Sequence, residues 1–438
     1  MNKLVIIGGG PGGYETAIYA AKQGIDTTLI ESSKLGGCCL NEGCIPTKAL
    51  VHASSLFEQL LSGQESSLNY QNLNFSMSAF QSKKEQIIEE SVAGIKQELA
   101  LSGVKLLEGK ATLLNEHTIQ VGKDTLEAES IIIATGASPI ILDFGVKTLT
   151  SKELLDSSEI TPNLVIIGGG VIGLEFASIY ASLKSQVTVI ERNPQILTGF
   201  DEGSVKALRV ILKKKGVNFI CGKGVTKIEA TPSGQQVILD DGTLIPCQTV
   251  LQGIGRKPNL EVLGKVKLTI TRKGISVNSV YQTSVPNIYA IGDVNGLMMT
   301  AYAASAEGRC VIDHLLNKSS NDNLQNLTKV VFTNPPLAEV GENSNTLKSK
   351  GIPFTTYKAY FASNGYARAT NETNGDIRLY VGEDETILGA DILGSMAQEL
   401  IAIIQVAIHN KMKVNNLKEL VLMHPTLSEI IITALRKK

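Results

Sequence analysis

The sequence predicts an α/β protein in which one parallel-sheet unit occurs twice and an α+β segment follows. Residues 4–32 and 164–192 are identical at 14 of 29 aligned positions, at an offset of 160 residues (168 − 8). Each stretch begins with an apolar run typical of a buried parallel strand, passes through a glycine-rich turn and continues in a helical pattern. From about residue 326, short β patterns mix with two helical patterns, Ala397 to Asn410 and Leu427 to Lys437. A chain of 438 residues has room for about three domains.

Composition narrows the range of partners. The formal net charge is −1, from 41 basic and 42 acidic side chains, and no block of one sign stands out, which favours neither nucleic acid nor an anionic membrane surface. The longest apolar run, Leu400 to Ile408, is too short to span a bilayer. Six cysteines are no disulfide framework, and a strand pattern directly after Lys3 leaves no room for a targeting peptide. We therefore expect a cytoplasmic location.

The glycine-rich turn in each stretch has the pattern G-x-G-x-x-G. The first glycine allows a tight turn, the second lets the backbone approach a pyrophosphate, and the third lets helix and strand pack closely. The glycines concerned are Gly8, Gly10 and Gly13 in the first copy and Gly168, Gly170 and Gly173 in the second. An acidic residue, Glu31 or Glu191, stands 18 residues after the third glycine in both copies (31 − 13 and 191 − 173), where it can hold ribose hydroxyls. The sequence therefore predicts two Rossmann-like dinucleotide-binding domains.

Glu191 bears on which dinucleotide the second copy binds. A carboxylate there would repel a 2′-phosphate, so it favours NAD over NADP. Arg192 beside it leaves an alternative open, because an arginine could receive that phosphate; it could equally be a solvated surface residue.

Two cysteines, Cys39 and Cys44, follow the first copy. Their spacing suits neither a zinc ribbon nor a thioredoxin motif, and the remaining cysteines are too scattered to complete a zinc site. One interpretation is a pair of buried structural thiols. The other is a reactive pair, because the stretch runs into a helical pattern from Thr47 to Leu60, and thiols at a helix start have a lowered pKa.

The segment GGCCLNEGCIPTK at 36–48 resembles the redox-active disulfide of the flavoprotein disulfide reductases. The resemblance runs the whole chain and includes IIIATGASP at 131–139, GIGRKPN at 253–259, IYAIGD at 288–293 and HPTLSE at 424–429. Within that family the chain is most similar to the lipoamide dehydrogenases, on the segments 40–50, 171–178, 292–296 and 397–401.

This resemblance implies FAD on the first unit and exchangeable NAD on the second, and from the scattered cysteines we expect no metal site. It implies that Cys39 exchanges with the substrate and that Cys44 faces the flavin, with His424 as the base and Glu429 orienting it. It also implies a Lys48–Glu175 pair near flavin N5. Further cofactor contacts implied are Pro11, Thr135, Gly136, Gly255, Arg256, Gly292 and Asp293.

The same resemblance implies a domain order. Residues 1–143 and 259–325 form the FAD-binding domain, 144–258 the NAD-binding domain and 326–438 an α+β dimerisation domain. In the implied homodimer, His424 and Glu429 of one subunit face the cysteines of the other. The partners implied are dihydrolipoyl groups of a 2-oxo acid dehydrogenase or glycine cleavage complex, with no nucleic acid and no membrane.

Four single residues depart from the lipoamide dehydrogenase pattern, and the segment after Val340 and Gly341 lacks its usual Thr-Glu. Cys38 replaces a threonine, Tyr302 and Leu422 each replace a histidine, and Pro336 replaces an acid. A vicinal Cys38–Cys39 disulfide would be strained, so we expect Cys38 to stay outside the redox pair.

Three hypotheses for the function follow. The first is a lipoamide dehydrogenase. The second is a related NAD(P)H-dependent disulfide, metal-ion or quinone reductase. The third is a flavin-bearing redox sensor or interaction subunit; the presence of Cys39, Cys44, His424 and Glu429 together speaks against it.

Overall fold

The structure is a computed structural model that describes residues 3–63, 68, 70–319 and 324–436. It contains two compact units, each assembled from three segments of the chain. Unit 1 comprises Met1–Thr47, Ser78–Ile140 and Gly255–Leu324, and unit 2 comprises Lys48–Met77, Ile141–Ile254 and Gln325–Lys438.

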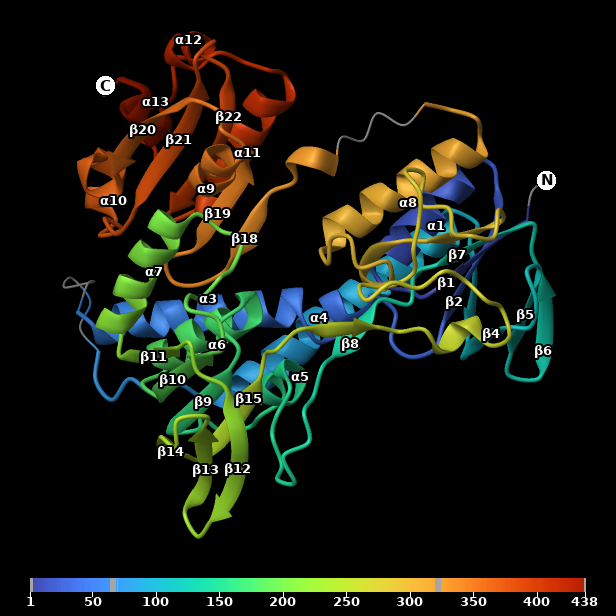
Figure 1. Cartoon of the computed structure of the whole chain (residues 1–438), viewed down its shortest axis with the longest axis horizontal. Coiled ribbons are helices and arrows are strands. Elements are labelled where there is room, and N and C mark those ends of the chain that lie inside the picture. Colours follow the sequence, from blue (N-terminus) through green and yellow to red (C-terminus); the bar gives the residue numbers. More distant parts are fainter. Residues whose placement is uncertain (1–2, 64–67, 69, 320–323, 437–438) are drawn as a thin grey trace. The chain divides into compact units, whose positions relative to one another are not determined.

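Unit 1 is built on a five-stranded parallel sheet. The strand order is β17 (Ile288–Ala290), β7 (Ser130–Ile133), β1 (Lys3–Ile7), β2 (Asp26–Glu31) and β3 (Lys105–Glu108). Alternate residues of β1 point to opposite faces, so Leu4 and Ile6 join one buried cluster while Val5 and Ile7 join another. The first cluster includes residues of α1 (Pro11–Lys22) and α8 (Ala301–Leu315), which lie side by side (Figure 1).

The second cluster of unit 1 packs against a small antiparallel sheet, β4 (Ala111–Leu113), β5 (Thr118–Val121) and β6 (Asp124–Glu127). A separate two-stranded ribbon joins β8 (Ala137–Pro139) to β16 (Arg256–Pro258). The mixed charged and apolar pattern from Ser78 to Leu101 predicts a helical insertion, and the long helix α4 (Met77–Leu101) lies there.

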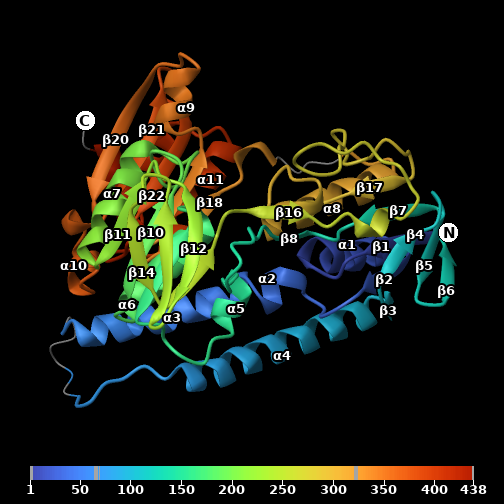
Figure 2. The ribbon, with the colours of Figure 1, turned by 60° about the horizontal axis from the view of Figure 1, so that its bottom comes forward.

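In unit 2, a second parallel sheet has the order β11 (Val217–Cys221), β10 (Gln186–Glu191), β9 (Asn163–Ile167) and β15 (Thr249–Gln252). Its helices include α6 (Val171–Ser182) and α7 (Glu202–Lys214), and an antiparallel sheet is made of β12 (Val225–Thr231), β13 (Gly234–Leu239) and β14 (Leu244–Cys247) (Figure 2). The short helix α5 (Ser151–Leu155) begins with a capping box formed by Thr150 and Glu153.

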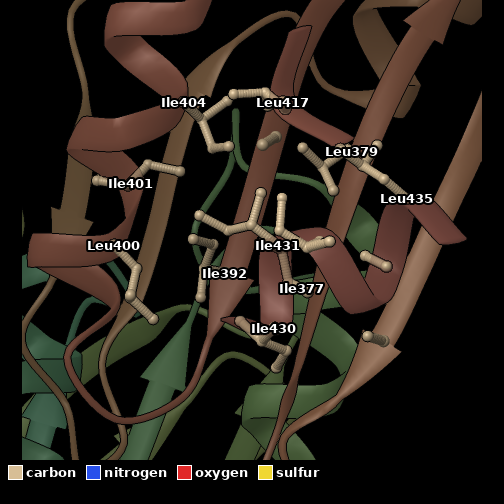
Figure 3. Packing of buried hydrophobic residues seen from close by; sticks show 14 of the residues in the cluster. Ile377, Leu379, Ile392, Leu400, Ile401, Ile404, Leu417, Ile430, Ile431 and Leu435 are labelled. Carbon is tan, nitrogen blue, oxygen red and sulfur yellow. The ribbon is translucent and has the colours of Figure 1, made fainter. Parts of the chain in front are cut away.

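The C-terminal part of unit 2 holds an antiparallel five-stranded sheet. Its order is β18 (Lys329–Val331), β19 (Leu337–Gly341), β22 (Ile387–Leu393), β21 (Asp376–Gly382) and β20 (Phe354–Tyr360). The helices here are α9 (Ser344–Ser349), α10 (Gly365–Ala369), α11 (Ala397–His409), α12 (Val414–Lys418) and α13 (Glu429–Arg436). Ile377 and Ile392 of the sheet pack against Ile404 of α11 and Ile431 of α13 in one buried cluster (Figure 3).

The predicted fold class is confirmed: two parallel-sheet units are followed by an α+β segment. The predicted helix at Ala397 to Asn410 matches α11 to within one residue. The predicted helix at Leu427 to Lys437 begins two residues later, at Glu429, and residues 437–438 lie outside the described residues. Gly255 and Arg256, expected at the end of the NAD-binding domain, belong to unit 1 because β16 pairs with β8. The three-domain division itself stays a prediction.

Over the described ranges, no helix is both long enough and apolar enough to cross a membrane.

Candidate functional site

The two glycine turns have the same backbone geometry. Gly8 has φ +113° and Gly168 has φ +110°, values that glycine adopts readily and side-chain-bearing residues rarely do. A Cβ placed on Gly13 would overlap the carbonyl oxygen of Gly8, and a Cβ on Gly173 would overlap that of Gly168. Each turn therefore needs its first and third glycines for steric reasons, whereas a Cβ on the second glycine would have no close neighbour.

The two helices that follow these turns present uncapped N-termini. Gly10 is the N-cap of α1 and Gly170 that of α6, and in the described structure neither N-cap makes a side-chain hydrogen bond to its helix. The first N–H groups and the helix dipole favour an anion at such an end. Both ends fit the pyrophosphate of a dinucleotide.

The acidic residues closing the second strands also match. Glu31 accepts hydrogen bonds from the N–H of Gly9 at 2.6 Å and of Ser33 at 2.7 Å. Glu191 accepts from the N–H of Gly169 at 2.7 Å and of Asn193 at 2.8 Å. Each carboxylate oxygen keeps a further lone pair for a ribose hydroxyl. We call each glycine turn together with its acidic residue a cradle: Gly8 to Gly13 with Glu31 is the first, and Gly168 to Gly173 with Glu191 is the second. Both cradles suit a dinucleotide.

Arg192, the residue that leaves NADP open, is exposed. Its side chain therefore fits the solvated alternative, while its backbone position beside Glu191 keeps it close to the second cradle.

The thiol segment, residues 36–48 with Cys38, Cys39 and Cys44, packs on the first glycine turn. Cys38 and Cys39 lie in the short helix α2 (Gly37–Asn41), and Cys44 is the first residue of α3 (Cys44–Leu61). A Cβ on Gly37 would lie 2.7 Å from the Cα of Gly10, so this approach needs glycine on the thiol segment. The side chains of Cys39 and Cys44 are half-buried. The structure thus holds both cysteines in the unit that carries the first cradle.

The predicted helix from Thr47 to Leu60 begins three residues earlier than expected, at Cys44 (47 − 44). Pro46 lies in its first turn, where a missing N–H removes no helical hydrogen bond. Cys44 therefore stands at a helix start, which is the position that favours a reactive thiol.

Cys38 has a different environment. Its Sγ accepts a hydrogen bond from Nη2 of Arg256 at 3.4 Å. Part of the side chain reaches the surface, yet surrounding protein atoms desolvate the sulfur and raise the pKa of the Cys38 thiol, against the opposing charge of Arg256. A raised pKa disfavours the thiolate, which agrees with a residue outside the exchange pair.

Two sets of contacts hold three of the remaining predicted cofactor contacts of unit 1. The hydroxyl of Thr135 donates to the carbonyl of Asn259 at 2.8 Å, and the amide of Asn259 donates back to the carbonyl of Thr135 at 2.9 Å. Nε of Arg256 lies 3.8 Å from Asp293, and its Nη2 donates to the carbonyl of Ala137. Burial raises the pKa of the Asp293 carboxyl, and Arg256 opposes that shift.

Glu307 of α8 is a residue that the sequence analysis missed. Its carboxylate is buried and accepts from the N–H of Gly292 at 2.7 Å and from the amide of Asn295 at 2.8 Å. Burial raises the pKa of Glu307 to about 7. The only local sign in the sequence that Glu307 is buried and bonded to backbone is that it is the one acid among the small residues 303–308.

Lys48 and Glu175 are brought together in unit 2. Nζ of Lys48 lies 3.1 Å from each carboxylate oxygen of Glu175. Phe332, also missed by the sequence analysis, adds a backbone N–H to Glu175 at 3.0 Å, and its ring centroid lies 4.2 Å from the Lys48 ammonium.

His424 and Glu429 form the dyad that the sequence implies. Nδ1 of His424 lies 3.0 Å from Oε1 of Glu429, and the N–H of Thr426 donates to Oε2 of that carboxylate at 2.9 Å. The hydrogen bond from Thr426 and the one from His424 lower the pKa of Glu429. The His424 side chain is 78% exposed, so its other nitrogen is open to a reacting group. The dyad can hold one imidazole tautomer and shuttle a proton at Nε2.

The other three departures lie in α8 of unit 1 and in the C-terminal part of unit 2. Tyr302 is exposed in the first turn of α8, and Leu422 packs against the cluster of Figure 3. The carbonyl of Pro336 accepts from the N–H of Gly394 at 3.0 Å.

Among the side chains that the structure describes, no group of three or more His, Cys, Asp or Glu residues is placed to hold a metal ion.

Comparison with family models gives two matches. The model described as pyridine nucleotide-disulphide oxidoreductase matches residues 2–308, and the dimerisation-domain model of the same description matches residues 327–435.

Curated relatives align over almost the whole chain. A dihydrolipoyl dehydrogenase of Geobacillus stearothermophilus is 34% identical, with 99% of this chain and 95% of the relative covered. One of Mycoplasma pneumoniae is 33% identical, with 99% and 98% covered.

Solved structures are also similar over the full length. LpdA from Mycobacterium tuberculosis has a TM-score of 0.93 at 26% identity, with 100% of this chain and 99% of that chain covered. The HOCl-induced flavoprotein disulfide reductase RclA from Escherichia coli has a TM-score of 0.90 at 28% identity, with 99% of both chains covered.

Proposed function

The chain belongs to the pyridine nucleotide-disulphide oxidoreductase family, and from that membership we propose that it is a dihydrolipoyl dehydrogenase. The family fixes the broader function, a flavoprotein disulfide reductase that uses a pyridine nucleotide. The finer proposal is oxidation of protein-bound dihydrolipoyl groups to the cyclic disulfide, with NAD⁺ as the acceptor.

FAD is proposed for the first cradle and NAD for the second. When bound, FAD supplies the electron carrier between a dithiol and the nicotinamide. Gly8, Gly10 and Gly13 hold its pyrophosphate, and Glu31 its ribose. The corresponding cradle at Gly168, Gly170 and Gly173 lets NAD exchange, and Glu191 receives ribose hydroxyls rather than a 2′-phosphate.

The proposed reaction begins at the Cys39–Cys44 disulfide. A dihydrolipoyl thiolate attacks Sγ of Cys39, a mixed disulfide forms and Cys44 leaves as a thiolate. The second substrate thiol then attacks the substrate sulfur of that mixed disulfide, which closes the lipoyl ring and releases Cys39 as a thiolate. Two protons leave the substrate, and the electron pair stays on the cysteine pair, of which Cys44 would be the member that faces a bound flavin.

His424 removes these protons in the proposal. Glu429 accepts a hydrogen bond from Nδ1–H, so Nε2 is the nitrogen that takes a thiol proton. The second family match is a dimerisation domain and supports a homodimer. We propose that the dyad of one subunit serves the cysteine pair of its partner.

The observation that carries this proposal is the pairing of a thiol segment packed on a dinucleotide turn with an exposed His–Glu dyad in one chain. A second candidate is a related reductase with another electron acceptor or disulfide. Two observations favour this second candidate. Tyr302 and Leu422 replace histidines of the lipoamide dehydrogenase pattern, and the chain is similar to RclA. A redox sensor would not need both the cysteine pair and the dyad.

Steady-state kinetics of the purified yellow protein test the proposal. We expect NADH formation from dihydrolipoamide and NAD⁺, little oxidation of NADPH by glutathione disulfide, and strong loss of the first activity in His424→Gln. The conservative variant His409→Gln, at an exposed position of α11, is the matched control. A fully FAD-loaded protein that forms no NADH from dihydrolipoamide would refute the finer proposal in favour of the second candidate.

A further inference from the structure

We propose that Phe332 is a positioning residue for Lys48, holding the Lys48–Glu175 pair at the place where its charge reaches the flavin. The inference rests on the proposed function and on the position near flavin N5 that the family resemblance implies for this pair. Phe332 follows the first strand of the C-terminal sheet, and its side chain carries no thiol and no titratable group.

Lys48, Glu175 and Phe332 form a closed set of contacts. Both carboxylate oxygens of Glu175 lie 3.1 Å from Nζ of Lys48. Oε1 of the same carboxylate accepts the backbone N–H of Phe332 at 3.0 Å. The Phe332 ring lies under the ammonium at 4.2 Å, within the range of a cation–π contact. Phe332 thus contacts both partners of the ion pair, one with its backbone and one with its ring.

Phe332 is itself held in place. It directly follows β18, and two residues later the N–H of Asn334 donates to Oγ of Ser178 at 2.9 Å. Ser178 lies one turn beyond Glu175 on α6, so the segment 332–334 runs along that helix and is fastened at both ends.

A third attachment joins this segment to α3. The amide of Asn334 donates to Oε2 of Glu58 at 2.9 Å, and the same oxygen accepts from Ser182 at 2.8 Å and from Lys215 at 2.6 Å. Glu58 belongs to the helix that also carries Lys48. The backbone that carries the Phe332 ring is therefore held by contacts that involve neither Lys48 nor the substrate.

The side chains of Lys48 and Glu175 differ in exposure, and for this reason the Phe332 ring restricts mainly the position of the Lys48 ammonium. The Glu175 side chain is 6% exposed, whereas that of Lys48 is 33% exposed. A lysine ammonium is strongly hydrated and has a flexible stem, so a partly exposed one readily exchanges an ion pair for water. The aromatic face covers one side of the ammonium and narrows the positions it can take. Removal of the ring should let Nζ move into water while Glu175 stays fixed.

The test compares Phe332→Leu, which keeps an apolar side chain without an aromatic face, with Phe332→Tyr, which keeps the ring. Phe354→Leu is the matched control, since Phe354 is another half-buried ring of unit 2 that packs edge-on against Tyr380 at 5.7 Å. The first measurement is the rate of Lys48 acylation by acetic anhydride in the FAD-loaded protein, followed by mass spectrometry. The second is the midpoint potential of the bound flavin.

In Phe332→Leu we expect Lys48 to be acylated at least about threefold faster and the flavin potential to fall, because a displaced cation stabilises the reduced, anionic flavin less. Phe332→Tyr and Phe354→Leu should each keep the Lys48 acylation rate and the flavin potential of the original protein. Unchanged acylation in Phe332→Leu would overturn the positioning role. Faster acylation with an unchanged potential would overturn the link to the flavin. Neither measurement needs turnover, so failure of the dihydrolipoamide assay is a separate result that refutes only the finer proposed function.

Discussion

The first and second glycine turns differ in what surrounds them far more than in their own geometry. Gly8 and Gly168 agree in φ to within 3° (113 − 110), and Glu31 and Glu191 accept corresponding backbone N–H groups. After β2, however, the chain enters α2 and α3 with their cysteines, whereas after β10 it reaches Asp201, the N-cap of α7.

The same helix position also takes different roles in the two copies. Glu15 and Glu175 are identical residues in aligned places, yet Glu15 is exposed while Glu175 is buried against Lys48 and Phe332. The comparison teaches that the repeat specifies a dinucleotide cradle, and that neighbouring segments specify what each cradle is for. Five predictions, each tested by substitution, break or sharpen that contrast.

Cys44→Ser should have the largest effect, because it removes the thiol that only the first copy carries. Turnover should fall by several orders of magnitude, as for loss of a nucleophile that acts as part of a unit. The long-wavelength thiolate–flavin absorbance of the two-electron-reduced protein should disappear. Its persistence in this variant would show that Cys44 is not the inner thiol.

Gly13→Ala and Gly173→Ala make the same steric change in the two cradles. In each, a Cβ would overlap the backbone oxygen of the first glycine, so the turn must deform. We expect Gly13→Ala to lose bound FAD, and Gly173→Ala to keep FAD but lose at least about tenfold in apparent NAD affinity. The FAD-to-protein absorbance ratio and the KM for NAD⁺ measure the two effects. Full FAD content in Gly13→Ala would contradict the assignment of the first cradle.

Glu191→Ala should weaken NAD use by about tenfold, the equivalent of one charge-assisted hydrogen bond. Glu31→Ala is the matched change in the other copy and should leave the KM for NAD⁺ unaltered. The measurement is kcat/KM with NADH and with NADPH. If their ratio does not move in Glu191→Ala, cofactor selectivity resides in another group, with Arg192 as the nearest candidate.

The second copy alone leads into a buried acidic network. Asp201 caps α7 and pairs with Arg378 at 3.1 Å, the hydroxyl of Ser204 donates to Asp391, and the N–H of Asp201 donates to Glu339. Burial raises the pKa of both Asp391 and Glu339 to about 7.

These raised pKa values fix the sign of a pH effect. Between about pH 4 and pH 7 the folded protein retains protons that the unfolded chain has lost, so the free energy of unfolding should fall as the pH rises through that window. Asp391→Asn should flatten the dependence of the free energy of unfolding on pH between about 4.5 and 7, by about 1 kcal/mol per pH unit for the proton removed, as measured by denaturant unfolding. Asp124→Asn, at an exposed position of β6, is the control. An unaltered slope in Asp391→Asn would mean that this carboxyl is ionised throughout.

Cys38→Thr should have the smallest effect, because the raised pKa of that thiol keeps it from competing with Cys39 and Cys44. We expect turnover within a few fold of the original and an intact thiolate–flavin band. Complete loss of activity would instead place Cys38 in the redox set.

The sequence predicted much of this arrangement because the features concerned are local. Apolar strand runs, glycine spacing and the pattern of Ala397 to Asn410 are set by steric rules and periodicity within a few residues. The start of α3 was placed three residues late, at Thr47 instead of Cys44, although Pro46 is compatible with a first helical turn. Short elements such as α9, α10 and α12 have too few residues to show a helical period.

What sequence alone determined is therefore the pair of cradles and the acids that close them, since each depends on backbone conformations that neighbouring residues impose. Tertiary structure decided which of two identical glutamates is buried. The partners of Glu175 lie 127 and 157 residues away in the chain, at Lys48 and Phe332. A buried carboxylate is stable only where packing brings it a cation and a donor, and that depends on contacts that no local pattern encodes.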